Sequence, residues 1–457
     1  NGAFSESNIK NFTIPASVVQ LYNMAFFGCP KLEEVEFEKS SKILSFTNHL
    51  FSNCFELKTI IIPEDSKLYL IGRNVFDSTS IEKLFIPASV EKLEEGWLNR
   101  VSNLNEVIIS ASNQNFKYLD DSHEIIVKKS DTNKEDYDTI IFASRLIKHA
   151  TIPKTIKRID SDAFANCVEI DYIEFCEDSQ LQTIGVAAFS NSSIKEIKIP
   201  KSVYSISNNA FSECFNLLNV KLEKGSKLRS LNKCLFDECE VLSSVIIPED
   251  CNLQSIKEYV FRNCPIMSLY IPKSVVEIKN KYENLSPIND LKISPNNKHF
   301  KFLDEDHKIV VTKSDTNKED FDTIIFINDN VVHAKIPKSI KFIDPYASSF
   351  NTSIKSIEID ENSEIQDISF INFLISNPIF ESIQLNKGDQ VLKNQRFKYL
   401  DDEHQIIVTK SDVNSDNFDT IIFADRKMKN AIIPKTVKYI GDNAFCNCKL
   451  NSIEFSE

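Results

Sequence analysis

A short internal repeat, marked by the dipeptide Ile-Pro, constrains the fold more than any other feature. Its proline recurs nine times, and most neighbouring copies lie about 24 or 48 residues apart. Unmarked copies, such as Val220-Lys-Leu222, stand within the 48-residue intervals, so the unit is 23–25 residues long. Periods of this length are typical of solenoids, whose units bury their apolar faces only by stacking. The prolines are Pro15, Pro63, Pro87, Pro153, Pro200, Pro248, Pro272, Pro337 and Pro434.

Each unit contains an alternating apolar segment and an Ala-Phe pair. Val220 and Leu222 alternate with polar residues, which predicts a strand with one buried face. A proline directly after such a strand ends it, because proline has no backbone N–H to donate to a neighbouring strand. The phenylalanine of the pair and the cysteine three positions later recur, so we expect two inward columns in which the cysteines are small buried hydrophobes. The columns are Phe26, Phe51, Phe76, Phe164, Phe189, Phe211, Phe236, Phe261 and Phe445, and Cys29, Cys54, Cys167, Cys214, Cys239, Cys264 and Cys448.

One strand in each coil of about 24 residues is the arrangement of a leucine-rich-repeat solenoid. We therefore expect a right-handed, curved solenoid of about 17 coils, mainly β, with short helical or 3-10 turns on the convex side. Neither end of the chain has a polar capping coil, so we expect a single solenoid, 1–457, that is truncated at both ends. Such ends are expected to fray or to associate end to end.

Three segments interrupt the repeat and share one pattern of three strand-like runs separated by polar turns. Each reads Asn-x-x-Phe-Lys-(Tyr/Phe)-Leu-Asp, then a run of Ile and Val, then Asp-Thr-Ile-Ile-Phe. This pattern predicts a β-hairpin folded into one coil. The inserts are 115–150, 297–334 and 394–431, and they separate repeat blocks at 15–114, 151–296, 335–393 and 432–457.

The repeated phrase IPxSVxxIxxxAFxxCxxLxxVxI resembles the BspA-like leucine-rich repeats of bacterial and protist surface proteins, over essentially the whole chain. The three inserts are similar to that family's own interruptions. The resemblance implies a cell-surface or secreted protein that contacts host or extracellular-matrix macromolecules, and it supplies no catalytic residues. The sequence departs from the pattern at Trp97 and Tyr282, and in degenerate coils around 345–380.

Composition excludes several classes of function. A net charge of −13 and a pI near 5.2 argue against a nucleic-acid partner, which requires a basic footprint. The sequence has no apolar run long enough to span a bilayer, and its first residues are not a signal peptide. Cys446 and Cys448 form a CxC pair that lacks the second ligand pair of a zinc site. No nucleophile elbow, P-loop or HExxH occurs, so we expect neither an enzyme nor a cofactor.

Polar turns in the inserts are the candidate metal sites. Oxygen-bearing residues at positions 1, 3 and 5 suit calcium, but glycine is missing at position 6 and a phenylalanine replaces the glutamate at position 12. A solvated hairpin turn is therefore favoured. The residues at positions 1, 3 and 5 of the three turns are Asp131, Asn133, Glu135, Asp315, Asn317, Glu319, Asp412, Asn414 and Asp416. His123, His307 and His404 each stand alone in a turn, which is too few ligands for a metal. Glycosylation sequons, weak support for secretion, begin at Asn11, Asn191, Asn284 and Asn351.

The outward face of the long strands is the candidate binding surface. In each strand the residue between the two inward apolar side chains points out. In the order of the coils these residues are Thr13, Glu36, Ile61, Phe85, Ile108, Thr151, Glu174, Lys198, Lys221, Ile246, Tyr270 and Lys292. Ile61, Phe85 and Ile108 are consecutive and apolar, and Ile246 with Tyr270 repeats the feature, so we expect them to bind a partner. A passive spacer in a surface coat is the alternative, and it has no reason to keep such a stripe.

Overall fold

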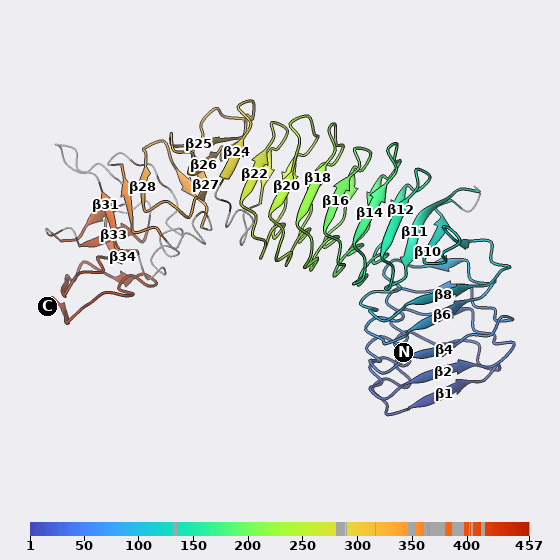
Figure 1. Ribbon diagram of the computed structural model, residues 1–457. Coiled ribbons are helices and arrows are strands. Elements are labelled where there is room, and N and C mark those ends of the chain that lie inside the picture. Colours follow the sequence, from blue (N-terminus) through green and yellow to red (C-terminus); the bar gives the residue numbers. More distant parts are fainter. Residues whose placement is uncertain are drawn as a thin grey trace. The chain divides into compact units, whose positions relative to one another are not determined.

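The computed structural model describes residues 1–457 except 132–134, 280–287, 289, 316, 346, 348–352, 361–362, 364, 366–379, 386–396, 402, 404, 413–415 and 457. It divides into two compact units, Asn1–Pro265 and Ile266–Glu457. The strands mark out about 17 turns of a β-solenoid, as the repeat predicts. In Figure 1 the strands of the first unit are stacked coil on coil.

One long strand and one short strand recur in the coils of the first unit (Figure 1). The long strands are β1 (Asn11–Ile14), β2 (Glu34–Phe37), β4 (Thr59–Ile61), β6 (Lys83–Ile86), β8 (Glu106–Ile109), β12 (His149–Ile152), β14 (Tyr172–Phe175), β16 (Glu196–Ile199), β18 (Asn219–Leu222) and β20 (Ser244–Ile246). The short strands are β3 (Ser45–Phe46), β5 (Leu70–Ile71), β7 (Lys92–Leu93), β13 (Arg158–Ile159), β15 (Thr183–Ile184), β17 (Ser205–Ile206), β19 (Ser230–Leu231) and β21 (Ser255–Ile256).

The second unit repeats this plan among its described residues. Its long strands are β22 (Ser268–Ile271), β24 (Asp290–Ile293), β28 (His333–Ile336), β30 (Ser356–Ile359), β31 (Ser382–Leu385), β35 (Asn430–Ile433) and β37 (Ser452–Phe455). Its short strands are β23 (Glu277–Ile278), β29 (Phe342–Ile343) and β36 (Tyr439–Ile440).

Within each sheet the long strands of neighbouring coils pair in parallel and without any shift of register, as in β1-β2-β4 and β6-β8. Val35 of β2 lies opposite Phe12 of β1 and Ile60 of β4, and its side chain is fully buried. Because a strand turns alternate side chains to opposite faces, the intervening Glu36 is exposed. The alternation read from the sequence therefore fixes which side chains enter the core.

The turn around each Ala-Phe pair is not helical, which corrects the expected helical or 3-10 turns. Among the described residues this segment is built from tight turns, with two residues of left-handed backbone four positions apart, such as Asn209 (φ 58) and Glu213 (φ 59). Alternate amide groups bond to the next coil: Phe211 N–H donates to the Leu235 carbonyl at 3.0 Å. The amides between them bond to carbonyls three residues back, as Ser212 N–H does to the Asn209 carbonyl at 3.0 Å. A helix would direct these donors to residues four positions back instead.

The two columns predicted from the sequence fill the core. The rings of Phe189 and Phe211 stack with their centroids 5.0 Å apart. Each column thiol also has a polar role: Cys214 Sγ donates to the Phe189 carbonyl at 3.1 Å and Cys239 Sγ to the Phe211 carbonyl at 3.0 Å. Burial raises the pKa of the Cys54 thiol to about 12. The six column cysteines from Cys29 to Cys264 are buried and Cys448 is half-buried; all eleven cysteines are free thiols.

Each insert forms three antiparallel strands, and the last of them pairs in parallel with the short strand of the next coil. They are β9 (Phe116–Tyr118), β10 (Ile125–Lys129) and β11 (Tyr137–Ala143); β25 (Phe300–Phe302), β26 (Ile309–Thr312) and β27 (Thr323–Ile327); and β32 (Phe397–Tyr399), β33 (Ile406–Lys410) and β34 (Phe418–Ala424). β11 pairs in parallel with β13, β27 with β29 and β34 with β36. Each insert is therefore part of a sheet of short strands. The predicted interruptions by β-hairpins are confirmed.

Candidate functional site

The structure aligns the predicted outward residues within each sheet of long strands. Thr13 lies opposite Glu36, Glu36 opposite Ile61, and Phe85 opposite Ile108, in the register of the parallel strands. In the rest of the first unit, Thr151 pairs with Glu174 and Lys198 with Lys221, which in turn pairs with Ile246. Tyr270 pairs with Lys292 in the second unit.

Exposure differs among the five candidate binding residues. The exposed fractions of Ile61, Ile108 and Ile246 are 43%, 42% and 51%. Phe85 and Tyr270 are half-buried. A larger fraction of each aliphatic residue is therefore exposed than of the two aromatic ones, the reverse of the ranking that aromatic anchors usually suggest.

The first insert is fixed beside the stripe formed by Ile61, Phe85 and Ile108. The Tyr118 hydroxyl donates to the Val107 carbonyl at 3.0 Å and accepts the Ile109 amide at 3.2 Å. These bonds hold the insert to β8, whose outward side chain nevertheless stays exposed.

A second apolar stripe, which the sequence reasoning missed, lies on the flank that carries the short strands. The exposed fractions of Val19, Leu44 and Tyr69 are 64%, 57% and 47%. They occupy the same repeat position in three consecutive coils, and Leu44 and Tyr69 directly precede the short strands β3 and β5. Tyr69 N–H donates to the Leu44 carbonyl at 2.8 Å. Reading this position coil by coil, as was done for the long strands, would have found them.

A shallow hollow of about 720 Å³ lies over the long strands β14, β16 and β18. Both signs of charge line it, including Glu174, Glu196 and Lys221, and Lys198 pairs with Glu223 at 2.6 Å. Ile246 is one of the residues that line the hollow, so its exposed apolar side chain lies in a surface of mixed apolar and charged residues.

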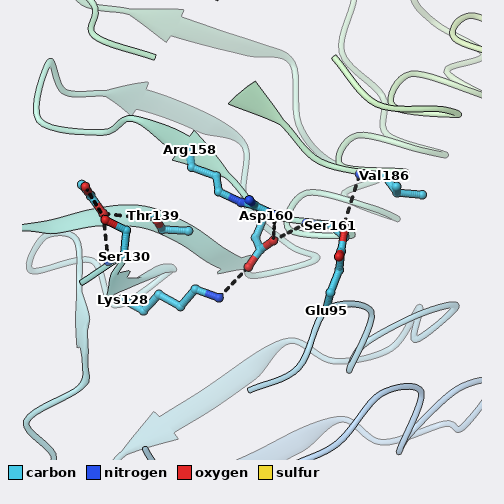
Figure 2. Close-up of polar contacts among 9 residues, drawn as sticks. Glu95, Lys128, Ser130, Thr139, Arg158, Asp160, Ser161 and Val186 are labelled. Atoms are coloured by element: carbon cyan, nitrogen blue, oxygen red, sulfur yellow. Dashed lines mark hydrogen bonds and ion pairs between the residues drawn. The ribbon is translucent and has the colours of Figure 1, made fainter. Parts of the chain in front are cut away.

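Polar contacts fix the first insert to the coils around it (Figure 2). Lys128 of β10 and Arg158 of β13 both pair with Asp160, at 2.7 and 3.0 Å. Although burial raises it, these two cations bring the pKa of Asp160 below its ordinary value. The Ser161 hydroxyl donates to Glu95 at 2.6 Å and accepts the Val186 amide at 3.1 Å. Every group drawn has a partner, so this network serves to position the insert.

The candidate calcium turns use their carboxylates within the insert. Glu135 pairs with Lys129 at 3.2 Å, Glu319 with Lys313 at 3.4 Å, and Asp416 with Lys410 at 3.7 Å, while Asp315 accepts the Asn317 amide at 2.9 Å. Within the described ranges, no group of three or more His, Cys, Asp or Glu side chains could hold a metal ion. Asn133 and Asn414 lie outside the described residues. The turn residues Asp131 and Asp412 are described, and both have contacts.

The histidines of the first two inserts have a structural role. His123 and His307 adopt positive φ, and their rings stack on Tyr118 and Phe302 at 4.1 and 4.5 Å. His404 lies outside the described residues. Of the four sequons, Asn11 is exposed, Asn191 donates to Asn166 at 2.8 Å, and Asn284 and Asn351 are not described. No helix in the described part of the chain is long and apolar enough to cross a bilayer.

Comparison with known proteins agrees with this architecture. The chain matches the family model described as the BspA type leucine rich repeat region in six copies, over residues 1–120, 137–251, 225–302, 312–402 and 416–457. No curated protein matches it.

Three solved structures are similar at low identity. A leucine-rich cell surface protein of Faecalibacterium prausnitzii is 18% identical over 83% of this chain and 89% of its own, with a TM-score of 0.47. A leucine-rich repeat protein of Eubacterium ventriosum is 20% identical over 63% and 87%, with a TM-score of 0.45. The pneumococcal vaccine antigen PcpA is 20% identical over 62% and 79%, with a TM-score of 0.39. The family model covers most of the repeat blocks, so the chain belongs to the BspA-type leucine-rich repeat family.

Proposed function

We propose that the chain is a non-enzymatic recognition array, at the cell surface or secreted, that adheres to host or extracellular-matrix macromolecules through the outward face of its long strands. The observation that carries the proposal is the run of Ile61, Phe85 and Ile108 in consecutive coils, on a face whose other outward residues are mostly polar. Isolated exposed hydrophobes are ordinary, whereas contiguous ones mark contact surfaces. Ile246 and Tyr270 are the secondary contacts in this proposal.

A spacer in a surface coat is the competing function. The second apolar stripe at Val19, Leu44 and Tyr69 bears on this choice, because it shows that exposed apolar side chains also occur away from the long-strand face. The two stripes have similar exposure and lie on the same block of coils. They therefore serve as matched surfaces for one experiment.

The test compares two double variants, Ile61→Asp with Ile108→Asp and Leu44→Asp with Tyr69→Asp. Each replaces two exposed apolar residues of the first block with carboxylates, so both should fold normally. Adhesion of protein-coated beads to cultured cells and to immobilised collagen, laminin and fibronectin is measured. We expect the first variant to lose adhesion at least about tenfold and the second to retain it, since hot-spot residues each contribute more than about 1.4 kcal/mol.

Equal adhesion by the wild type and the first variant would reject the long-strand stripe. An absence of adhesion by the wild type to every surface would favour the spacer. End-to-end association of chains, the other expected interaction, is measured separately by the dependence of sedimentation on concentration, in the same preparations.

A further inference from the structure

Each insert carries a cluster of lysines beside an aromatic ring, and the three clusters use the same repeat positions. In every insert one lysine precedes the second aromatic residue of the first strand, and two more lysines stand in the turn after the next long strand. The clusters are Lys117, Lys154 and Lys157 with Tyr137; Lys301, Lys338 and Lys341 with Phe321; and Lys398, Lys435 and Lys438 with Phe418. Three recurrences of this kind, in a chain of net charge −13, call for a physical explanation.

The aromatic ring holds the first lysine in place. The ammonium groups of Lys117 and Lys301 lie 4.3 Å from the ring centroids of Tyr137 and Phe321, and that of Lys398 lies 4.7 Å from Phe418. An ammonium over an aromatic face is attracted by the ring quadrupole, which reduces the freedom of an otherwise flexible side chain. The lysine is thus partly ordered before any ligand arrives. This ordering reduces the conformational entropy that the side chain would lose on binding.

Acids neutralise part of the charge of the clusters, because Lys157 pairs with Asp138 at 3.3 Å and Lys438 with Asp419 at 3.6 Å. Other nearby acids have other partners. A different, largely buried lysine pairs with the insert's glutamate, as in Lys313 with Glu319 at 3.4 Å. Asp322 accepts the Ser314 amide at 2.8 Å and its hydroxyl at 2.7 Å. Lys301 and Lys338 are exposed.

In the second insert these lysines line a single hollow. Its volume is about 640 Å³, and its polar lining consists of Lys301, Lys338, Lys341, the hydroxyl residue Ser339, and the acids Glu319 and Asp320. Glu319 pairs with Lys313, which lies outside this lining. The first and third inserts place Thr155 and Thr436 at the position of Ser339, so a hydroxyl donor recurs with the amines. The second insert therefore offers several ammonium groups and one hydroxyl to a ligand in one concave site.

We propose that the three inserts bind the sulfate groups of a sulfated polysaccharide, one site in each insert. Ammonium and hydroxyl donors suit the oxygens of a sulfate. Three separate small sites in an acidic chain fit a polymer that presents its charges at intervals, whereas a nucleic acid needs a continuous basic footprint. This surface differs from the long-strand stripe, so either can fail without the other.

The test measures binding of immobilised heparin, a densely sulfated probe, to the full chain at physiological salt. The cluster variant changes six exposed lysines to serine: Lys117, Lys154, Lys301, Lys338, Lys398 and Lys435. The control variant makes the same change at six exposed lysines that belong to none of the three clusters, Lys31, Lys42, Lys58, Lys67, Lys224 and Lys227. A third variant changes the six cluster lysines to arginine and keeps their charge.

We expect the cluster variant to bind heparin at least about tenfold more weakly, with a shallower salt dependence, because fewer counterions are released. The control and arginine variants should stay within about threefold of the wild type. Desulfated heparin and hyaluronan, which carry only carboxylates, should bind weakly. The proposal is overturned by a wild type that does not bind heparin, by equal losses in the cluster and control variants, or by equal binding of hyaluronan or single-stranded DNA.

Discussion

Arg145, directly after the first insert, is a buried cation whose removal can be calculated from its contacts. Only 1% of its surface is exposed. Its guanidinium donates to the Ala143 and Ala163 carbonyls at 3.2 Å each and to the Asp162 carbonyl at 3.4 Å. In a regular coil the counterpart of the Ala163 carbonyl accepts a turn amide of the preceding coil, as Leu235 does from Phe211. Here the Ala163 carbonyl accepts the Ala143 amide of the insert at 2.8 Å, and the arginine adds a second donor to it.

Substituting Arg145→Met removes these donors without leaving a large cavity. Net hydrogen bonds from a charged group contribute about 1.5–3 kcal/mol each, and the distances here place them at the weak end. Three such bonds sum to about 4–5 kcal/mol. Part of this loss is offset in the methionine variant, because no charge then has to be buried. We expect a loss of about 3 kcal/mol in the free energy of unfolding, which is within the range for breaking a buried polar network.

The loss should depend on pH through Asp162. Burial raises the pKa of this carboxyl to about 7, although the positive charge of Arg145 lowers it. A carboxyl whose pKa is raised in the folded state binds more protons there, so stability falls as pH rises from about 4 to about 7. Without Arg145 that pKa rises further and the fall extends to higher pH. The destabilisation is therefore expected to be larger at about pH 8 than at about pH 5.

Arg426→Met is the matched control, because Arg426 occupies the same position after the third insert. It is 6% exposed and donates to the Ala444 carbonyl at 3.4 Å. Asn443 stands where the first insert has Asp162, so the control should destabilise with no comparable pH dependence. Urea unfolding at both pH values measures the loss, and hydrogen exchange localises it to 137–167. Equal stability of Arg145→Met and wild type, or the same pH dependence in both variants, would refute the reasoning.

Two further predictions concern the cysteines and calcium. The exposed Cys176 should react with a thiol reagent first in the native chain, while the buried column cysteines react only on unfolding, because the reagent cannot reach them. Mass spectrometry of the labelled chain checks this, and early modification of Cys54, whose pKa burial raises to about 12, would contradict it. Chelation of calcium should leave the thermal midpoint unchanged, because the turn carboxylates of Glu135 and Glu319 already pair with lysines. A rise of several degrees in millimolar calcium would indicate a bound ion, since ligands stabilise the state that they bind.

The fold could be predicted from the sequence because its two strongest signals are local and repeated. Alternation in Val35-Glu-Phe37 assigns a buried face to each strand, and the spacing of Ile-Pro sets the length of the coil. A one-residue slip would expose every apolar side chain of a strand, so the pattern also fixes the register between coils. The inserts were predictable for the same reason, because the three copies repeat one alternating pattern.

The turns were harder to predict, because every second amide in them donates its hydrogen bond to the next coil rather than within its own. An apolar pair followed three residues later by a cysteine has the spacing of a helical turn. The helix does not form because residues such as Asn209 and Glu213 take left-handed backbone and the amide of Phe211 bonds to the next coil. The energy of such a bond belongs to the stack of coils rather than to one coil, so no single repeat contains the signal.

Exposure on the long-strand face was predictable in direction but not in degree, and the reason bears on the proposed binding surface. Alternation correctly turns Ile61 and Phe85 outward, yet one is 43% exposed and the other is half-buried. Strand direction does not determine how far neighbouring coils and the attached insert cover a side chain. A partner at this surface therefore gains more newly buried area from Ile61 and Ile108 than from Phe85. We accordingly expect Phe85→Ala to weaken adhesion less than Ile61→Asp with Ile108→Asp; a larger effect of Phe85→Ala with normal folding would show that the aromatic ring is the anchor.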